Sequence, residues 1–62
     1  MNNEIFIEYY VDGVIQTSRH RAHIPRVGEH IKLPYGIYIV IDVCHYEDIN
    51  VPKVQIELES IE

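Results

Sequence analysis

The chain has 62 residues, of which 47% are hydrophobic and 24% are charged, and its formal net charge at pH 7 is -5. This balance is typical of a globular domain and excludes an intrinsically disordered chain. The length predicts one domain over residues 1–62, close to the lower limit at which a core forms without disulfides or metals. The negative charge argues against general nucleic-acid binding, which usually needs a strong positive excess.

A single cysteine, Cys44, excludes an internal disulfide. The first residues contain neither a basic start nor a long apolar run. The longest apolar stretch, Ile37–Ile41, is far shorter than the roughly 18 residues of a membrane-spanning helix. We therefore expect a cytoplasmic protein without a membrane-spanning helix.

Charges are unevenly distributed along the chain. Residues 1–33 hold as many acids as bases, whereas acids dominate from residue 34 onward. The first part contains Glu4, Glu8, Asp12 and Glu29 with Arg19, Arg21, Arg26 and Lys32, and the second contains Asp42, Glu47, Asp48, Glu57, Glu59 and Glu62 with Lys53. This asymmetry predicts a basic stripe and an acidic side, which suit head-to-tail association or a partner with a charged patch.

Residues 4–11 alternate in hydrophobicity with a period of two, which predicts a strand. Asp12-Gly13 then predicts a two-residue hairpin turn, because both residues tolerate positive φ. Counting outward from this turn gives the expected pairs, which are Val11 with Val14, Tyr10 with Ile15, Glu8 with Thr17 and Phe6 with Arg19. The expected core face then carries Ile5, Ile7, Tyr9, Val11, Val14, His20, Ala22 and Ile24, and the outer face carries Phe6, Glu8, Tyr10, Ile15, Thr17, Arg19 and Arg21.

The rest of the chain predicts three more strands. Proline and glycine in residues 25–29 end the second strand, and Pro34-Tyr35-Gly36 predicts a tight turn. The further expected strands are His30–Leu33 with Ile31 and Leu33 inward, the two-sided apolar central strand Ile37–Tyr46, and, after a polar loop over Glu47–Val51, Lys53–Ile61 with Val54, Ile56 and Leu58 inward. Five antiparallel strands in a chain of this length predict an all-β fold, a small and partly open barrel.

The turn Pro25-Arg26-Val27-Gly28-Glu29, the short strand after it and Gly36-Ile37-Tyr38-Ile39-Val40 resemble small stand-alone SH3-like barrel proteins of bacterial and phage genomes. The resemblance covers about two thirds of the chain and is structural, so it carries no functional residues. It implies a five-stranded SH3-like barrel. It also implies that some such proteins, encoded by phages, inhibit host defence systems by binding.

Histidines and the cysteine raise two chemical hypotheses. His20 and His23, with His30 and Cys44-His45 further on, invite a zinc site, but two strand residues three apart face opposite ways. Cys44 beside His45 invites a nucleophile with its base, yet strand neighbours also face opposite ways, and such a cysteine is usually a buried apolar residue. We therefore predict no metal site, no cofactor and no enzymatic activity.

The segment 19–26 has an unusual composition, with five basic or imidazole side chains in eight residues: Arg19, His20, Arg21, His23 and Arg26. One interpretation is an edge strand protected by charge, in which the arginines pair with Glu8 or Glu4. The other is a surface that binds an anion or an acidic partner, with Tyr10 and Phe6 beside it on the same face.

Phe6, Tyr10 and Ile15 gather on the expected outer face. Exposed apolar clusters on small domains commonly mark an interface, so these residues predict self-association, with a symmetric dimer as the first expectation. Tyr35, at a turn, is either a turn residue or a contact residue.

Three functions remain open at this point. The first is a non-catalytic protein that acts through protein-protein interaction, such as a phage-encoded inhibitor of a bacterial defence system. The second is a binder of a nucleotide or short nucleic acid, which uses the Arg19–Arg26 stripe and stacks bases on Tyr10 or Tyr35. The third is a structural subunit of a larger complex.

Overall fold

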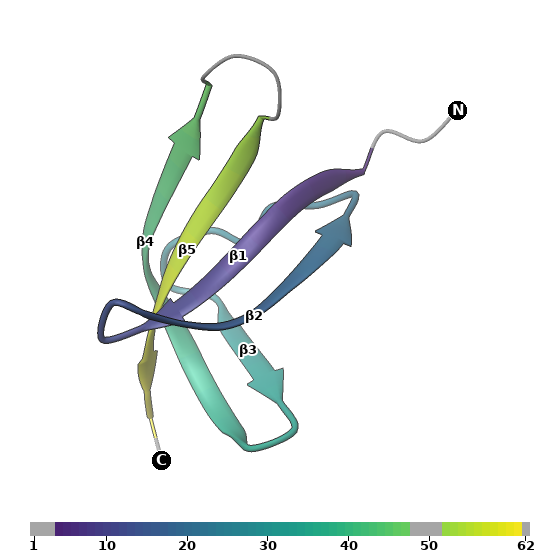
Figure 1. Ribbon diagram of the computed structural model, residues 1–62. Helices are drawn as coiled ribbons and strands as arrows, with labels where there is room; N and C mark the ends of the chain where they lie inside the picture. Colours follow the sequence, from purple (N-terminus) through teal and green to yellow (C-terminus); the bar gives the residue numbers. More distant parts are fainter. Residues whose placement is uncertain (1–3, 48–51, 62) are drawn as a thin grey trace.

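A computed structural model describes residues 4–47 and 52–61 of the chain. Figure 1 shows a single sheet that curls on itself into a half-barrel. Its strands are β1 (Ile5–Val11), β2 (Val14–Arg21), β3 (His30–Leu33), β4 (Gly36–Tyr46) and β5 (Lys53–Ser60). The described residues contain no helix, and therefore none that could cross a membrane. The prediction of an all-β, barrel-like fold is confirmed.

The order of strands across the sheet is β2-β1-β5-β4-β3. Three neighbouring pairs are antiparallel, as predicted, but β1 and β5 run parallel. The prediction of a wholly antiparallel sheet is therefore wrong. The first and last strands are neighbours, and no local turn connects them to impose opposite directions.

Alternation along β5 supplies much of the core. Val54, Ile56 and Leu58 are buried, as predicted from their period-two spacing. The complete buried cluster is Ile7, Tyr9, Leu33, Val40, Val54, Ile56 and Leu58. We call the concave side of the sheet that carries this cluster the inner face, and the opposite side the outer face.

The turn at Asp12-Gly13 has the predicted geometry, with φ of 53° and 77°. Beyond it, β1 and β2 pair as expected at Val11 with Val14 and at Tyr10 with Ile15. The register then shifts, because Gln16 is an extra residue that forms a β-bulge. The remaining pairs are Tyr9 with Thr17, Glu8 with Ser18, Ile7 with Arg19, Phe6 with His20 and Ile5 with Arg21.

The connection between β2 and β3, residues 22–29, crosses the open side of the half-barrel (Figure 1). Its Ile24 packs against the core, as predicted. Gly28, at φ 97°, turns the chain so that its N–H donates to the Val40 carbonyl at 2.9 Å, and the Val40 N–H donates to the Glu29 carbonyl at 2.9 Å. These two hydrogen bonds attach the connection to β4 just before the first residue of β3.

The other predicted turn and strand lie where expected. Pro34 and Tyr35 form the turn between β3 and β4, and Ile31 and Leu33 are the inward residues of β3. The predicted polar loop lies outside the described residues except for Glu47.

Candidate functional site

The bulge at Gln16 decides which face carries the arginines. Paired residues share a face, so Arg19 and Arg21, opposite Ile7 and Ile5, belong to the inner face, and His20, opposite Phe6, belongs to the outer face. The predicted surface that combined the arginines with Phe6, Tyr10 and Ile15 is therefore wrong.

Side-chain contacts agree with this register. The Phe6 and His20 rings lie 5.1 Å apart on the outer face, which corrects the prediction that His20 faces the core. On the inner face, burial raises the pKa of the Tyr9 hydroxyl, and the nearby charges of Arg21 and Arg19 partly offset this. Arg19 and Arg21 of β2 thus lie near the Tyr9 hydroxyl of β1.

Glu8 is the centre of a polar network on the outer face, across β1 and β5. Its Oε1 accepts hydrogen bonds from Tyr10 Oη at 3.0 Å and Gln55 Nε2 at 3.1 Å, and lies 3.3 Å from Lys53 Nζ. Gln55 also donates to the Tyr10 hydroxyl at 3.2 Å, and Lys53 Nζ lies 5.2 Å from the centre of the Tyr46 ring. The proposed pairing of Glu8 with an arginine is replaced by its pairing with Lys53.

These contacts shift two pKa values. Burial raises the pKa of Glu8, but hydrogen bonds from Gln55, Tyr10 and Lys53, with the Lys53 charge, outweigh it and leave that pKa below its ordinary value. The hydrogen bond to Glu8 raises the pKa of the Tyr10 hydroxyl. The network therefore favours an ionised Glu8 and a neutral Tyr10, which holds the Tyr10 ring in place.

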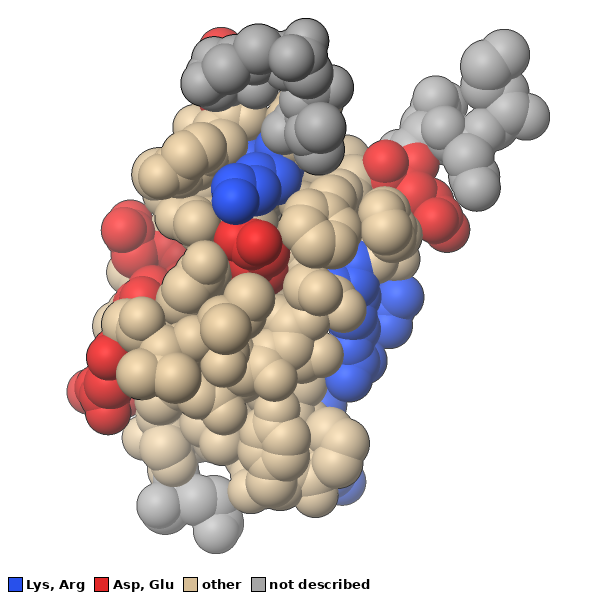
Figure 2. Space-filling model, viewed as in Figure 1, with Lys and Arg blue, Asp and Glu red and all other residues tan. Residues whose placement is uncertain are grey.

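The apolar part of the outer face lies next to this network. Ile15 is 49% exposed, and its partner Tyr10 and the neighbouring Phe6 are half-buried. Figure 2 shows a broad area without charged side chains between a margin of acidic residues and a margin of basic ones. The charge asymmetry of the sequence thus becomes two opposite margins of the folded domain.

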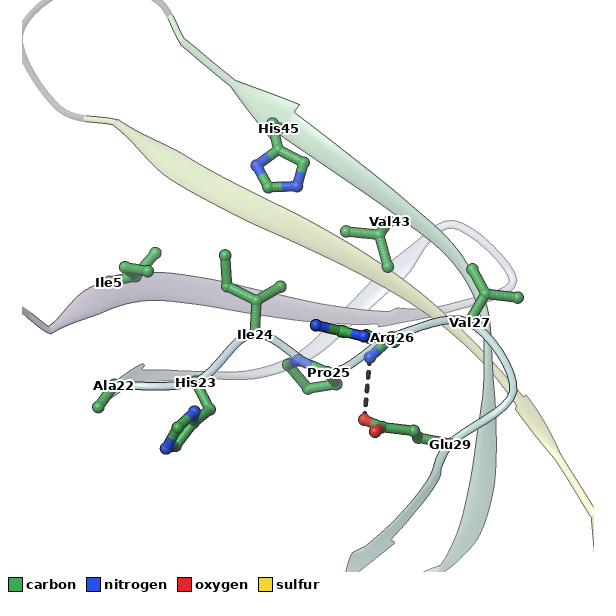
Figure 3. Close-up of a pocket in the computed structure, with 10 residues that line it drawn as sticks. All are labelled: Ile5, Ala22, His23, Ile24, Pro25, Arg26, Val27, Glu29, Val43 and His45. Carbon is green, nitrogen blue, oxygen red and sulfur yellow. Dashed lines mark hydrogen bonds between the residues drawn. The ribbon is translucent and has the colours of Figure 1, made fainter.

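A groove opens on the inner face between β4, the start of β1 and the 22–29 connection, with a volume of about 890 Å³. Its lining is mainly apolar, with Ile5, Ile24, Pro25, Val27 and Val43, and also includes Ala22, His23, Arg26, Glu29 and His45. Figure 3 shows His45 and Val43 projecting from β4 toward the connection, where Ile24 and the Arg26 guanidinium lie. His23 points away from them.

A short turn holds Arg26 at this groove. The Arg26 N–H donates to Glu29 Oε1 at 2.9 Å, and the Glu29 N–H donates to the Arg26 carbonyl at 3.0 Å. Arg26 is therefore separated from Arg19 and Arg21, which lie on β2, and the stripe predicted over residues 19–26 is divided between two places.

The remaining candidate residues are dispersed. Tyr35 is exposed at its turn, where its ring meets Tyr38 edge-on and its hydroxyl donates to the Gln16 carbonyl at 3.5 Å, so it links the two edges of the sheet. Cys44 is exposed, which corrects the expectation of a buried cysteine. No group of three or more His, Cys, Asp or Glu side chains among residues 4–47 and 52–61 could hold a metal ion.

Reasoning from the sequence missed the groove and the Glu8 network. Glu8 with Tyr10 and Lys53 with Gln55 are polar pairs at i, i+2 spacing on their strands, which is a signal for a polar face. Only the parallel pairing of Glu8 with Gln55 brings the two pairs together.

Comparison with known proteins finds no matching family model, no matching curated protein and no matching solved structure.

Proposed function

We propose that this domain is a non-catalytic protein-binding module that docks a partner protein on the outer face of the β1–β2 hairpin. The observation that carries the proposal is that Phe6, Tyr10 and Ile15 share this outer face, where the charges of Glu8 and Lys53 beside them are paired with each other. An apolar patch with a polar rim is the usual composition of an interface centre.

The network around Glu8 supports this role because it reduces the entropy that binding costs. The Tyr10 hydroxyl is already fixed by Glu8 and Gln55, and the Phe6 ring already lies against His20. Side chains that are ordered before contact lose little freedom when a partner covers them.

The first partners to test follow from the resemblance to SH3-like barrel proteins of bacterial and phage genomes. That resemblance favours a phage-encoded inhibitor in the bacterial cytoplasm whose target is a protein of a defence system. From the same resemblance we also propose that the half-barrel is an SH3-like barrel.

The experiment compares the wild-type protein with Ile15→Asp as bait for proteins of a bacterial lysate, at dilutions where the bait has the mass of a single chain. The introduced carboxylate would have to lose its water inside an apolar contact, so a specific partner should be retained at least about tenfold less. Glu59→Asp, on an exposed part of β5, is the control and should retain it fully. Equal retention of every captured protein by wild type and Ile15→Asp would contradict the proposal.

Nucleotide or short nucleic-acid binding has narrower support. Arg19 and Arg21 share the inner face beside Tyr9, which could hold a phosphate group. Tyr10 lies on the opposite face and cannot stack a base of the same ligand. Phosphate or nucleotides that stabilise the wild type but not Arg19→Ala against heat would favour this alternative. No feature of the described residues favours a structural subunit in particular.

A further inference from the structure

Three stretches of the sheet have an unpaired edge. The shortest is the four-residue β3, which pairs only with β4 and carries the basic Lys32. The two longer ones are β2, which pairs only with β1 apart from the bond of the Tyr35 hydroxyl to the Gln16 carbonyl, and the second half of β4, because β3 pairs only with Gly36–Ile39 and the 22–29 connection bonds only to Val40. Within the described part of the chain, nothing pairs with residues 41–46 on the side away from β5. Free rows of backbone N–H and C=O groups accept another strand.

The two longer edges carry opposite charges. β2 presents Arg19 and Arg21, and neither is joined to an acid by an ion pair within residues 4–47 and 52–61. On the other side, Asp42 of β4 lies directly opposite Glu57 of β5, a like-charge pair that is unfavourable unless a cation approaches it. Figure 2 shows acidic and basic side chains at opposite sides of the face.

Contact between two copies of the same edge is disfavoured. A β2–β2 contact gathers four arginines along one seam, with no acid on either strand to pair with them. The β4 edge of another copy instead offers Asp42, with Glu57 of β5 beside it, on a stretch of six residues against the eight of β2. We propose that β2 of one molecule docks on residues 41–46 of a second copy and extends its sheet.

The charges also select the direction of the added strand. In the sheet, β2 and β4 run the same way, since each is antiparallel to one of the parallel strands β1 and β5. Turning the incoming molecule over makes its β2 antiparallel to β4 and places its inner-face Arg19 and Arg21 on the acceptor's outer face, beside Asp42. Its Ile15 and His20 then face the side of the acceptor where the groove opens.

Such a contact is heterologous, so each molecule keeps one free donor edge and one free acceptor edge. Assembly therefore continues beyond two copies, into a chain or a closed ring, in contrast to the symmetric dimer expected from the sequence. The contact uses backbone edges and charges, so it does not depend on the partner-binding role of the outer face.

The test is the mass of the purified protein in solution, measured by sedimentation over a range of concentrations. In low salt the wild type should exceed the mass of a dimer as concentration rises. Raising the salt from about 0.05 M to about 0.5 M should weaken association, because the charges are screened over a shorter distance. A mass of one chain at every concentration in low salt would overturn the proposal.

Variants with reversed charges test which two strand edges form the contact. Arg19→Glu with Arg21→Glu, and separately Asp42→Lys, should each weaken association about tenfold or more. An equimolar mixture of the two variants should have a higher mass in solution than either variant alone. The double arginine variant keeps the acidic β4 edge, and Asp42→Lys keeps the basic β2 edge that docks on it. Glu59→Lys has the same charge change as Asp42→Lys but lies on the interior strand β5, and it should associate as the wild type does. A stable dimer that Asp42→Lys leaves unchanged, or a mixture that recovers no mass, would contradict edge docking.

Discussion

β5 and β2 are both eight-residue strands, but the sheet holds them differently. β5 lies between β1 and β4 and buries the alternate side chains Val54, Ile56 and Leu58, whereas β2 is an edge strand whose residues are mostly exposed. The alternation in β5 predicted its buried residues correctly, and the register of β2 was predicted wrongly beyond Ile15. The buried residues of β5 fix which of its faces points inward, while the exposed edge strand β2 absorbs an extra residue at little cost.

The largest predicted difference between the two strands is the loss of folding free energy when an apolar side chain is shortened to alanine. Ile56 of β5 is fully buried, so Ile56→Ala should lower the free energy of unfolding by roughly 2–5 kcal/mol. Ile15→Ala on β2 removes the same atoms from a half-exposed site and should change it by less than about 0.5 kcal/mol. Urea titration of the two variants measures the difference. Similar losses for both would mean that Ile15 is buried in solution, as it would be in an assembly.

The same contrast explains how much of the fold the sequence predicts. Local signals suffice for the five strands, the Asp12-Gly13 turn and the buried residues of β5, because each depends on neighbours in the chain. The parallel pairing of β1 with β5 depends on strands far apart in sequence, and no local pattern encodes it.

The candidate site is less predictable than the fold for a related reason. Residues 16–21 of β2 contain no apolar alternation that could reveal the bulge, so the faces of Arg19, His20 and Arg21 could not be assigned by counting. The groove needs the 22–29 connection to cross the sheet, which its proline and glycine permit but do not specify. Phe6, Tyr10 and Ile15 were grouped correctly because Tyr10 and Ile15 pair before the bulge and Phe6 shares a strand with Tyr10.

A smaller effect should come from Glu8, whose side chain joins β1 to β5 but not to β2. Glu8→Gln removes the charge that Lys53 approaches and should cost on the order of 1 kcal/mol at neutral pH. Because folding lowers the pKa of Glu8 below its ordinary 4.5, its contribution is present above that pH and is lost as the pH falls through the lower, folded value.

Unfolding measured against pH for both proteins checks this sign. The stability difference between wild type and Glu8→Gln should shrink on acidification below about pH 4.5. A difference that stays constant down to full protonation would mean that the Glu8 charge does not stabilise the folded state. Glu59→Gln, which removes an exposed carboxylate from the same strand as Gln55, is the matched control for changes in net charge.

A small effect on stability should also come from deleting Gln16, which tests the bulge directly. In the observed register Tyr10 pairs with Ile15 and Tyr9 with Thr17, so Gln16 has no partner, and its removal leaves every other pair unchanged. We expect a stability change below about 1 kcal/mol, since the deletion removes an exposed side chain, its 3.2 Å hydrogen bond to the Val14 carbonyl and the 3.5 Å bond of the Tyr35 hydroxyl to the Gln16 carbonyl. The Phe6 and His20 rings should stay in contact, which a nuclear Overhauser effect between them would report. If β2 instead continued without a bulge, Arg19 would lie opposite Phe6 in the intact protein, and deletion of Gln16 would bring His20 there for the first time. A ring contact that appears only in the deletion variant would therefore return the arginines to the outer face and remove the charge argument for docking at β4.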